Sequence, residues 1–420
     1  MQKKLVFIFS IKVLIAFLNL AIVIILSRFI GAEGKGEASI IVTSIAMILL
    51  FCNMIGGSSL VYLVPRYNPF LLFLLSNAWS IFICAFAYIG FKFFPAIPET
   101  FVTPVILLSL INSFLSTNLT ILLGKEKVMS NNYISLLQTF INLIVLLLMI
   151  KSFQQADIQA YISSLYIAMG TCLIISTILI FPYLKKNSFV NGKESAIELL
   201  KLGFMNQMGH IMKFMTFRIS YYAMAYFSGT SILGIYSNGI ALVESLLLIS
   251  NSFATILYPK VSNSADYQYT QKLTLQMTKA SIIICMLALI PLIILPSAFW
   301  TWLFGLEFSG VNKVIILLAP GILFYNIALI IGHYFSGVGK YNINTISNLL
   351  GLITTIILSL MVIPSYGIKE AGIISSISYL VTALFIMFSF AKEAKLKTHE
   401  LFPAFADLKW LKEQMKVLLK

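Results

Sequence analysis

Residues 204–257 read FMNQMGHIMKFMTFRISYYAMAYFSGTSILGIYSNGIALVESLLLISNSFATIL. Two apolar runs, each of about 20 residues and long enough to cross a bilayer as a helix, lie on either side of a glycine-containing turn. The same arrangement occurs near the start of the chain, and three turn residues match at one constant offset: Phe29, Gly31 and Gly36 with Phe227, Gly229 and Gly234. Asn53 matches Asn251 at that offset. The stretch therefore predicts paired membrane helices within an internal repeat.

The composition of the whole chain agrees with this interpretation. Of 420 residues, 59% are hydrophobic and 10% are charged, which is far from the profile of a soluble domain. We expect an all-α integral membrane protein with about twelve spans. The expected spans are Leu5–Arg28, Ser39–Leu63, Phe70–Phe94, Phe101–Leu123, Tyr133–Ile150, Tyr161–Phe181, Phe204–Phe227, Ile232–Leu257, Ser281–Leu303, Val314–Phe335, Ile343–Ile363 and Ala371–Ala391.

The repeat divides these spans into two halves. Residues 135–150 match residues 347–362, which adds a second alignment to the one through the glycines. Because each half contains six spans, both halves have the same orientation in the membrane. We expect an N-terminal six-helix bundle at 1–181, a basic cytoplasmic linker at 182–203 and a C-terminal six-helix bundle at 204–391.

The last segment, residues 392–420, has a different pattern. Apolar residues recur at helical spacing from Leu401 to Leu418, with lysines on the other faces. This favours an amphipathic helix on anionic cytoplasmic lipid, and a frayed basic tail is the alternative.

The net charge of +14 comes from the positions of the basic residues relative to the membrane. With the N-terminus inside, most lysines outside the spans fall in cytoplasmic segments, including Lys3, Lys4, Lys185, Lys186 and the lysines after Lys392. This positive-inside bias places both termini in the cytoplasm. The charge is thus explained by topology, and we expect no nucleic-acid partner.

Basic residues inside the spans indicate the chemistry of the cargo. His210, Lys213 and Arg218 share one polar face of the seventh span, and Lys12 occupies the repeat position of His210. Cations in the bilayer core are costly, so they usually face a watery cavity, and their surplus suggests an anionic cargo. For Lys12 and for Arg28, at the outer end of its span, snorkelling to the interface is the alternative.

The predicted spans contain one acidic residue, Glu244. It is either the counter-ion of Arg218 or part of a proton or cation relay. Uncharged polar residues in the spans are candidates for sugar contacts or interhelical hydrogen bonds: Asn53, Asn206, Gln207, Tyr221 and Asn251.

Signatures for other chemistries are absent from the sequence. There is no GxxxxGK[ST] motif, and three histidines with four cysteines dispersed among the spans make no metal-binding pattern. We expect a protein that is not an enzyme and has no cofactor or metal.

Three stretches together resemble a known family, the polysaccharide flippases (O-antigen transporter type) of the multidrug/oligosaccharidyl-lipid/polysaccharide exporter superfamily. Residues 27–50 are similar to the end of that family's first span, its external turn and its second span. Residues 218–262 resemble its seventh and eighth spans, and residues 304–353 resemble its ninth-to-eleventh-span region.

The resemblance implies two six-helix bundles around a central cavity and transport by alternating access. The implied cargo is an oligosaccharide, such as an O-antigen or capsule repeat, on undecaprenyl pyrophosphate, moved from the cytoplasmic to the outer leaflet of the bacterial plasma (inner) membrane. The predicted cavity cations, Lys12, Arg28, His210, Lys213 and Arg218, would hold its head group. Membrane lipids, a glycan polymerase and a chain-length regulator are the expected partners.

Three other functions remain open at this stage. A multidrug exporter of the same superfamily shares the fold, but a positive cavity is unsuited to the cationic drugs it would carry. A membrane glycan polymerase, ligase or acyltransferase usually has a large external catalytic loop, and the external loops here are short. A scaffold for glycan assembly predicts that the cations in the spans are dispensable.

Overall fold

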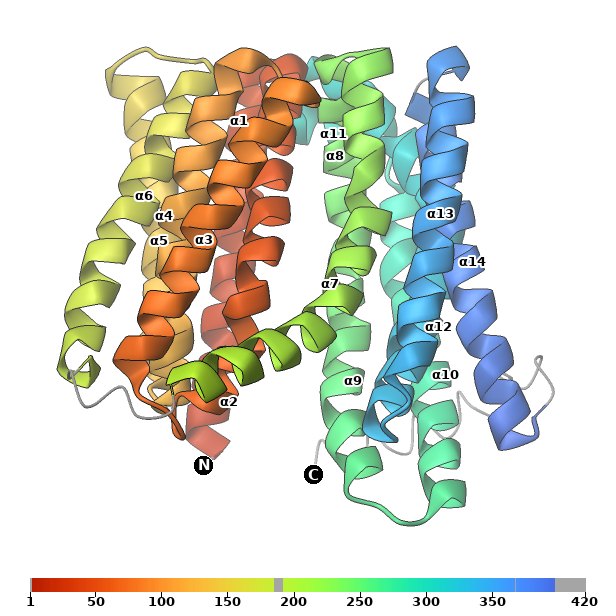
Figure 1. Cartoon of the computed structure of the whole chain (residues 1–420). Coiled ribbons are helices and arrows are strands. Elements are labelled where there is room, and N and C mark those ends of the chain that lie inside the picture. Colours follow the sequence, from red (N-terminus) through yellow and green to blue (C-terminus); the bar gives the residue numbers. More distant parts are fainter. Residues whose placement is uncertain (1, 185–191, 367, 397–420) are drawn as a thin grey trace. The chain divides into compact units, whose positions relative to one another are not determined.

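The computed structural model describes residues 2–184, 192–366 and 368–396, and every regular element in these ranges is helical (Figure 1). The chain forms two compact units, one ending at Phe214 and one starting at Met215. The division falls inside helix α7 (Gly192–Ser228), which also contains part of the predicted linker 182–203. The all-α membrane fold is confirmed, and the predicted domain limits stay a prediction.

The N-terminal unit is built around helix α1 (Gln2–Cys52). It continues through η1 (Asn53–Ile55), α2 (Gly57–Leu63), α3 (Pro69–Phe93), α4 (Glu99–Gly124), α5 (Val128–Ser152), α6 (Ile158–Ile180), η2 (Phe181–Tyr183) and the first part of α7. Helix α4 packs on α3 and α6, and α5 packs on α6 and α1. A cluster of buried residues, among them Leu60 of α2, Leu122 of α4, Ile180 of α6 and Leu199 of α7, forms a hydrophobic core in this unit.

Helix α1 contains a sharp break at Gly31, where φ is 77° and ψ is −175°. A positive φ is accessible to glycine at little cost, whereas a side chain there would be strained. Asn19 precedes the break and Ile45 follows it, and both line one cavity of the N-terminal unit. The chain therefore reverses direction between these two residues. Helix α1 therefore holds the first predicted span and the first part of the second, which continues through η1 and α2.

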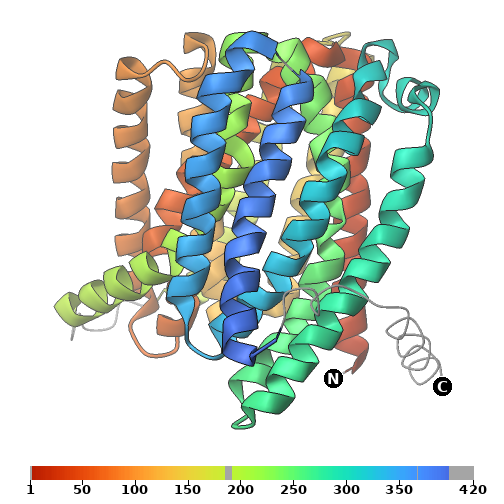
Figure 2. The ribbon, with the colours of Figure 1, turned by 90° about the vertical axis from the view of Figure 1, so that its right-hand side faces the viewer.

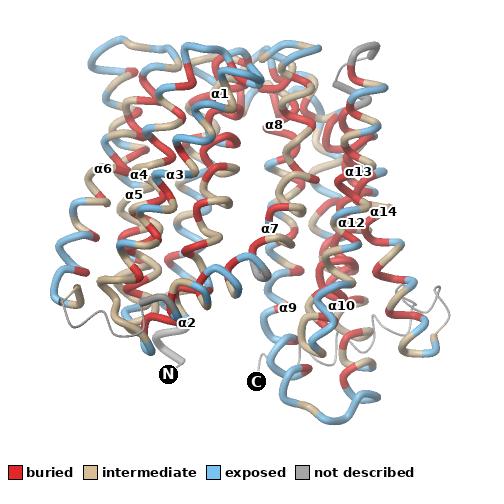
Figure 3. Tube along the Cα trace, in the orientation of Figure 1, coloured by how far each residue is buried: buried red, intermediate tan, exposed pale blue. Residues whose placement is uncertain are grey.

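The C-terminal unit surrounds one buried helix, α12 (Val311–Gly337), which packs on α14, α10, α9 and α8 (Figure 2). After the end of α7, the unit consists of α8 (Thr230–Ser245), α9 (Leu247–Ser262), α10 (Tyr267–Ile294), α11 (Ser297–Phe304), η3 (Leu306–Gly310), α12, α13 (Tyr341–Tyr366) and α14 (Ile368–Ala394). Most of the α12 trace is buried, whereas α13 exposes much of its length (Figure 3). At Gly321 a Cβ would lie 2.5 Å from the Cα of Ser376, so glycine lets α12 and α14 approach closely.

The two units share one helix arrangement, as the predicted repeat requires. Gly229, between α7 and α8, has φ 89° and ψ 160°, close to the conformation of its repeat partner Gly31. The packing pairs α3–α4, α4–α6 and α5–α6 recur as α10–α12, α12–α14 and α13–α14.

The described helices contain ten segments that are long and apolar enough to cross a membrane. One of them, Ser10–Leu63, corresponds to two predicted spans, and the predicted span in α7 is not among the ten. His210, Lys213, Arg218 and the other polar residues of α7 lower its hydropathy. The chain is therefore a multi-pass membrane protein with ten to twelve candidate spans.

The ninth predicted span, Ser281–Leu303, has the wrong limits. Helix α10 begins at Tyr267, capped by the Asp266 side chain, and Pro296 separates it from the short helix α11. Hydropathy detects the apolar part of a helix and therefore missed its polar first turns, in which Thr270 and Thr274 are buried. The eighth predicted span is divided into α8 and α9 at Leu246. The predicted tail is described only as far as residue 396, and its remainder lies outside the described residues.

Candidate functional site

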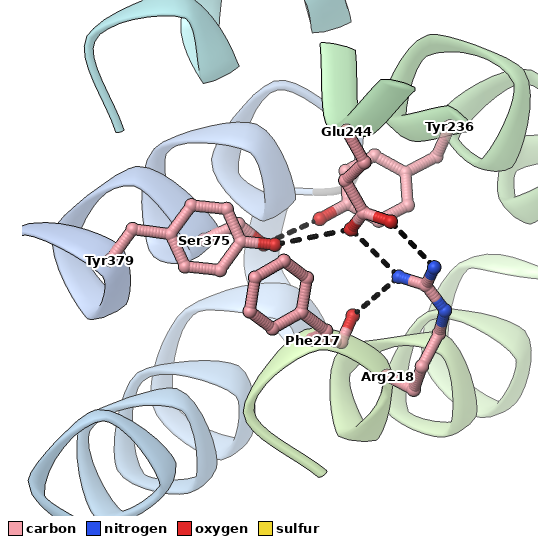
Figure 4. A network of polar contacts seen from close by, with 6 residues as sticks. All are labelled: Phe217, Arg218, Tyr236, Glu244, Ser375 and Tyr379. Atoms are coloured by element: carbon pink, nitrogen blue, oxygen red, sulfur yellow. Dashed lines mark hydrogen bonds and ion pairs between the residues drawn. The ribbon is translucent and has the colours of Figure 1, made fainter. Parts of the chain in front are cut away.

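An ion pair joins α7 to α8 within the C-terminal unit. The Arg218 guanidinium donates two hydrogen bonds to the Glu244 carboxylate, Nη1 to Oε1 at 2.8 Å and Nη2 to Oε2 at 2.6 Å (Figure 4). Arg218 Nη1 also donates to the Phe217 carbonyl at 3.2 Å, and the Tyr379 hydroxyl donates to Glu244 Oε1 at 3.3 Å. The side chains of Arg218 and Glu244 are 23% and 15% exposed.

Aromatic side chains enclose this ion pair. The Arg218 guanidinium lies 5.1 Å from the ring centroid of Tyr221, and the Phe217 ring lies 4.5 Å from that of Tyr379 on α14. Next to them, the Tyr236 hydroxyl is 2.7 Å from Ser375 Oγ (Figure 4). The same hydroxyl donates to the Ala371 carbonyl. Such surroundings strengthen a charge-assisted bidentate pair and fasten α7 to α8 and α14.

The geometry therefore gives Glu244 the counter-ion position beside Arg218. In this arrangement the Arg218 charge is matched by a carboxylate, and an anionic ligand would have to displace Glu244 to reach it. The alternative role of Glu244, as part of a proton or cation relay, stays a prediction.

The other predicted cations lie in the N-terminal unit. Lys12 and Arg28 are exposed on α1, and on α7 His210 is exposed while Lys213 is half-buried. The boundary between the units falls between Lys213 and Arg218, so the five predicted cations are divided between two compact bodies. Their binding of a head group stays a prediction.

The predicted amide contacts have different surroundings. Asn53 Oδ1 accepts a hydrogen bond from Ser116 Oγ at 3.3 Å, which joins η1 to α4. Gln207 is buried on α7, Asn251 is exposed on α9, and the side chain of Asn206 lies outside the described residues. Tyr221 is buried, and its ring packs at 5.9 Å from that of Tyr236.

The N-terminal unit contains two cavities, lined by both polar and apolar side chains, that were not predicted from the sequence. One, of about 220 Å³, lies among α1, α4, α5 and α6, and the other, of about 310 Å³, is lined by α1, α4 and α5. Both are lined by Leu49, Asn112 and Gln138, so they adjoin. A signal existed in the sequence, because Asn131, Gln138 and Asn142 recur on one face of α5, but amides in an apolar helix are equally typical of hydrogen bonds between helices.

The chain is similar in sequence to proteins named for glycan and capsule biosynthesis. No family model matches the chain. It is 27% identical over 202 residues to the capsular polysaccharide biosynthesis protein CapF of Staphylococcus aureus, covering 47% of this chain and 50% of that protein. It is 24% identical over 233 residues to the probable low-salt glycan biosynthesis flippase Agl15 of Haloferax volcanii, covering 54% and 48%. The chain thus matches about half the length of these curated relatives.

Solved structures share the fold over nearly the whole chain. The lipid II flippase MurJ, in an inward closed conformation, matches with a TM-score of 0.71 at 16% identity, covering 99% of this chain and 91% of that chain. An inward-facing multidrug resistance MATE family transporter of the MOP superfamily matches with a TM-score of 0.66 at 13% identity, covering 91% and 94%. The predicted resemblance is confirmed: the relatives are named for capsular polysaccharide and glycan biosynthesis, one of them as a probable flippase, and the fold is the one that MurJ and MATE transporters share.

Proposed function

We propose that this protein is a flippase for lipid-linked oligosaccharides. In its finer form the proposal is that it moves an oligosaccharide on undecaprenyl pyrophosphate from the cytoplasmic to the outer leaflet of a bacterial plasma membrane by alternating access. Both termini would be cytoplasmic, and a glycan polymerase and a chain-length regulator would act on the exported unit.

The observation that carries the proposal is the excess of basic over acidic residues in the predicted spans. Lys12, Arg28, His210 and Lys213 lie on α1 and α7, whereas Glu244, the one acidic residue of the predicted spans, is bonded to Arg218. A membrane interior with surplus positive charge suits a pyrophosphate, because cations stabilise phosphate strongly at low dielectric. The glycan-related names of the relatives support the same cargo class.

The multidrug-exporter alternative shares the fold and predicts a different site. A cationic drug would be stabilised by carboxylates in the spans, and Glu244 is occupied by Arg218. The described residues that line the two cavities of the N-terminal unit include no acid. These features favour a cargo that consists of an anionic lipid carrier and an uncharged glycan, and they disfavour a cationic drug as the cargo.

The proposed roles of the cations are tested by complementing a strain that lacks the gene. Lys12→Ala, His210→Ala and Lys213→Ala should each reduce surface glycan, because one charge-assisted hydrogen bond contributes about 1.5–3 kcal/mol, or roughly 10- to 100-fold in affinity. Lys92→Ala is the matched control, since Lys92 lies in the last turn of α3 against the Tyr88 ring. Full glycan export by all three variants at normal protein levels would refute the assignment.

The same strain separates the flippase from the exporter. Loss of the gene should leave sensitivity to cationic dyes unchanged and reduce surface glycan. The opposite pattern, dye sensitivity with normal glycan, would replace the flippase proposal with the exporter.

A further inference from the structure

The two adjoining cavities of the N-terminal unit have a wall of neutral polar side chains. Helix α4 contributes Asn112, Ser116 and Thr120 at intervals of four residues, so all three lie on one face. Helix α5 contributes Asn131, Gln138 and Asn142, again on one face, and α1 adds Asn19. Helices α4 and α5 thus each present a polar stripe to a cavity within the bilayer-spanning part of the chain.

The lining is uncharged. Among the described residues that line either cavity, none is acidic or basic. Side-chain amides both donate and accept hydrogen bonds, as does a sugar hydroxyl or an N-acetyl group. A phosphate or a cationic drug would find no opposite charge here, so the chemistry favours an uncharged polyol.

Several of these amides are available to a ligand. No hydrogen bond between described residues occupies the side-chain amides of Asn19, Asn112 and Gln138. Asn142, by contrast, accepts a hydrogen bond from Ser164 Oγ at 2.8 Å, and Thr139 donates to the Ser135 carbonyl. Polar groups in an apolar interior are costly unless they are paired, so unpaired amides facing a cavity indicate that water or a ligand completes their hydrogen bonds.

We propose that these two cavities bind the uncharged sugar part of the cargo, with Asn112 and Gln138 at the centre of the site. The inference rests on the proposed function and deepens it, because it separates sugar recognition from the binding of the pyrophosphate. The proposed site is distinct from the predicted contacts at Asn53, which accepts a hydrogen bond from Ser116, and at Tyr221, whose ring packs on that of Tyr236.

The size of the site agrees with a short saccharide. The cavities of about 220 and 310 Å³ adjoin at Asn112 and Gln138, and together they fall in the range of about 300–1,000 Å³ that is typical of small-molecule sites. Tyr161, at the first turn of α6, lines one of them and adds an aromatic face against which a sugar ring can pack.

The test uses the full-length chain, immobilised in nanodiscs, and two probes in equal amounts. One probe is the lipid-linked oligosaccharide fraction from cells that lack the gene, and the other is undecaprenyl pyrophosphate without sugar. Mass spectrometry of the retained lipids gives the ratio of glycosylated to bare carrier. Asn112→Leu and Gln138→Met should each lower this ratio by about five- to tenfold, as expected for one lost hydrogen bond, and leave retention of the bare carrier unchanged.

Asn342→Leu is the matched control, because Asn342 is an exposed amide on α13 in the other unit and is not among the predicted contacts. An unchanged ratio in the Asn112→Leu/Gln138→Met double variant would overturn the sugar site and leave the flippase proposal standing. Equal loss of both lipids would also overturn it, since the cavity would then serve the carrier. If the unmodified chain retains no more glycosylated lipid than empty nanodiscs, the proposed function itself fails.

A second measurement does not depend on the folding of any variant. The saccharide released from the same lipid fraction by mild acid should compete with the glycosylated lipid for the unmodified chain, and should not displace the bare carrier. Absence of competition at a large excess of free saccharide would refute a sugar-binding site.

Discussion

Replacing Glu244 by Gln should strongly destabilise the C-terminal unit. The change removes the carboxylate that accepts two hydrogen bonds from Arg218, at 2.8 and 2.6 Å, and leaves a guanidinium whose side chain is 23% exposed. Breaking a buried pair by removing one partner costs about 3–5 kcal/mol, and partial exposure places this pair near about 3 kcal/mol. For a unit of roughly 200 residues, that corresponds to a fall of about 6–12 °C in melting temperature.

The assay is a double-mutant cycle on the detergent-solubilised protein, with melting followed by size-exclusion chromatography. Glu244→Gln and Arg218→Leu should each lower the melting temperature, and the double variant should recover most of the loss because no unpaired charge remains. Lys340 and Glu393 form the matched control pair. Their atoms approach to 2.7 Å, but the Lys340 side chain is 52% exposed, so Glu393→Gln should cost about 1 kcal/mol or less. A coupling energy below about 0.5 kcal/mol for Arg218 and Glu244 would refute this explanation.

Further predictions concern the pH dependence of one contact and the repeated turns. The Tyr67 hydroxyl donates to Glu198 Oε2 at 2.7 Å, and this hydrogen bond to a carboxylate raises the pKa of Tyr67 to about 12. The pKa of Tyr67 in the folded chain lies above the ordinary value near 10, so the contact stabilises the fold fully below pH 10 and loses this effect as pH rises through about 12. Ultraviolet titration of the phenolate measures this pKa, and a Tyr67 that titrates near 10 would contradict the prediction. Gly31→Ala and Gly229→Ala should each cost about 1–2 kcal/mol, because an alanine must adopt φ of 77° or 89°. Gly90→Ala is the control: Gly90 lies within α3, where an added Cβ meets open space, so this variant should stabilise the protein by about 0.5–1 kcal/mol. Equal melting temperatures for all three variants would contradict the assignment of these turns.

Much of the fold was predictable because membrane helices and repeats have strong local signals. Gly31 and Gly229 were matched from the sequence alone. Both have a positive φ, and each lies at the turn between two helical segments. The extent of α10 was not predictable from hydropathy, since its first turns bury threonines against protein instead of presenting apolar residues to lipid. Helix limits of this kind depend on tertiary packing.

The candidate sites were predictable in part. Charges inside spans are conspicuous, so Arg218 and Glu244 were found, but their bidentate pairing depends on how α7 and α8 pack. Asn112 and Gln138 were missed because isolated amides in apolar helices commonly bond to neighbouring helices, as Asn118 does to Ser176. Only a cavity distinguishes an amide that faces a ligand from one that joins two helices.

Mass spectrometry of undecaprenyl-linked lipids tests the flippase proposal most directly, by comparing a strain that lacks the gene with its parent. The proposal predicts that a completed, unpolymerised oligosaccharide accumulates on undecaprenyl pyrophosphate, with a mass that identifies the cargo. An unchanged lipid pool in the strain that lacks the gene would contradict it.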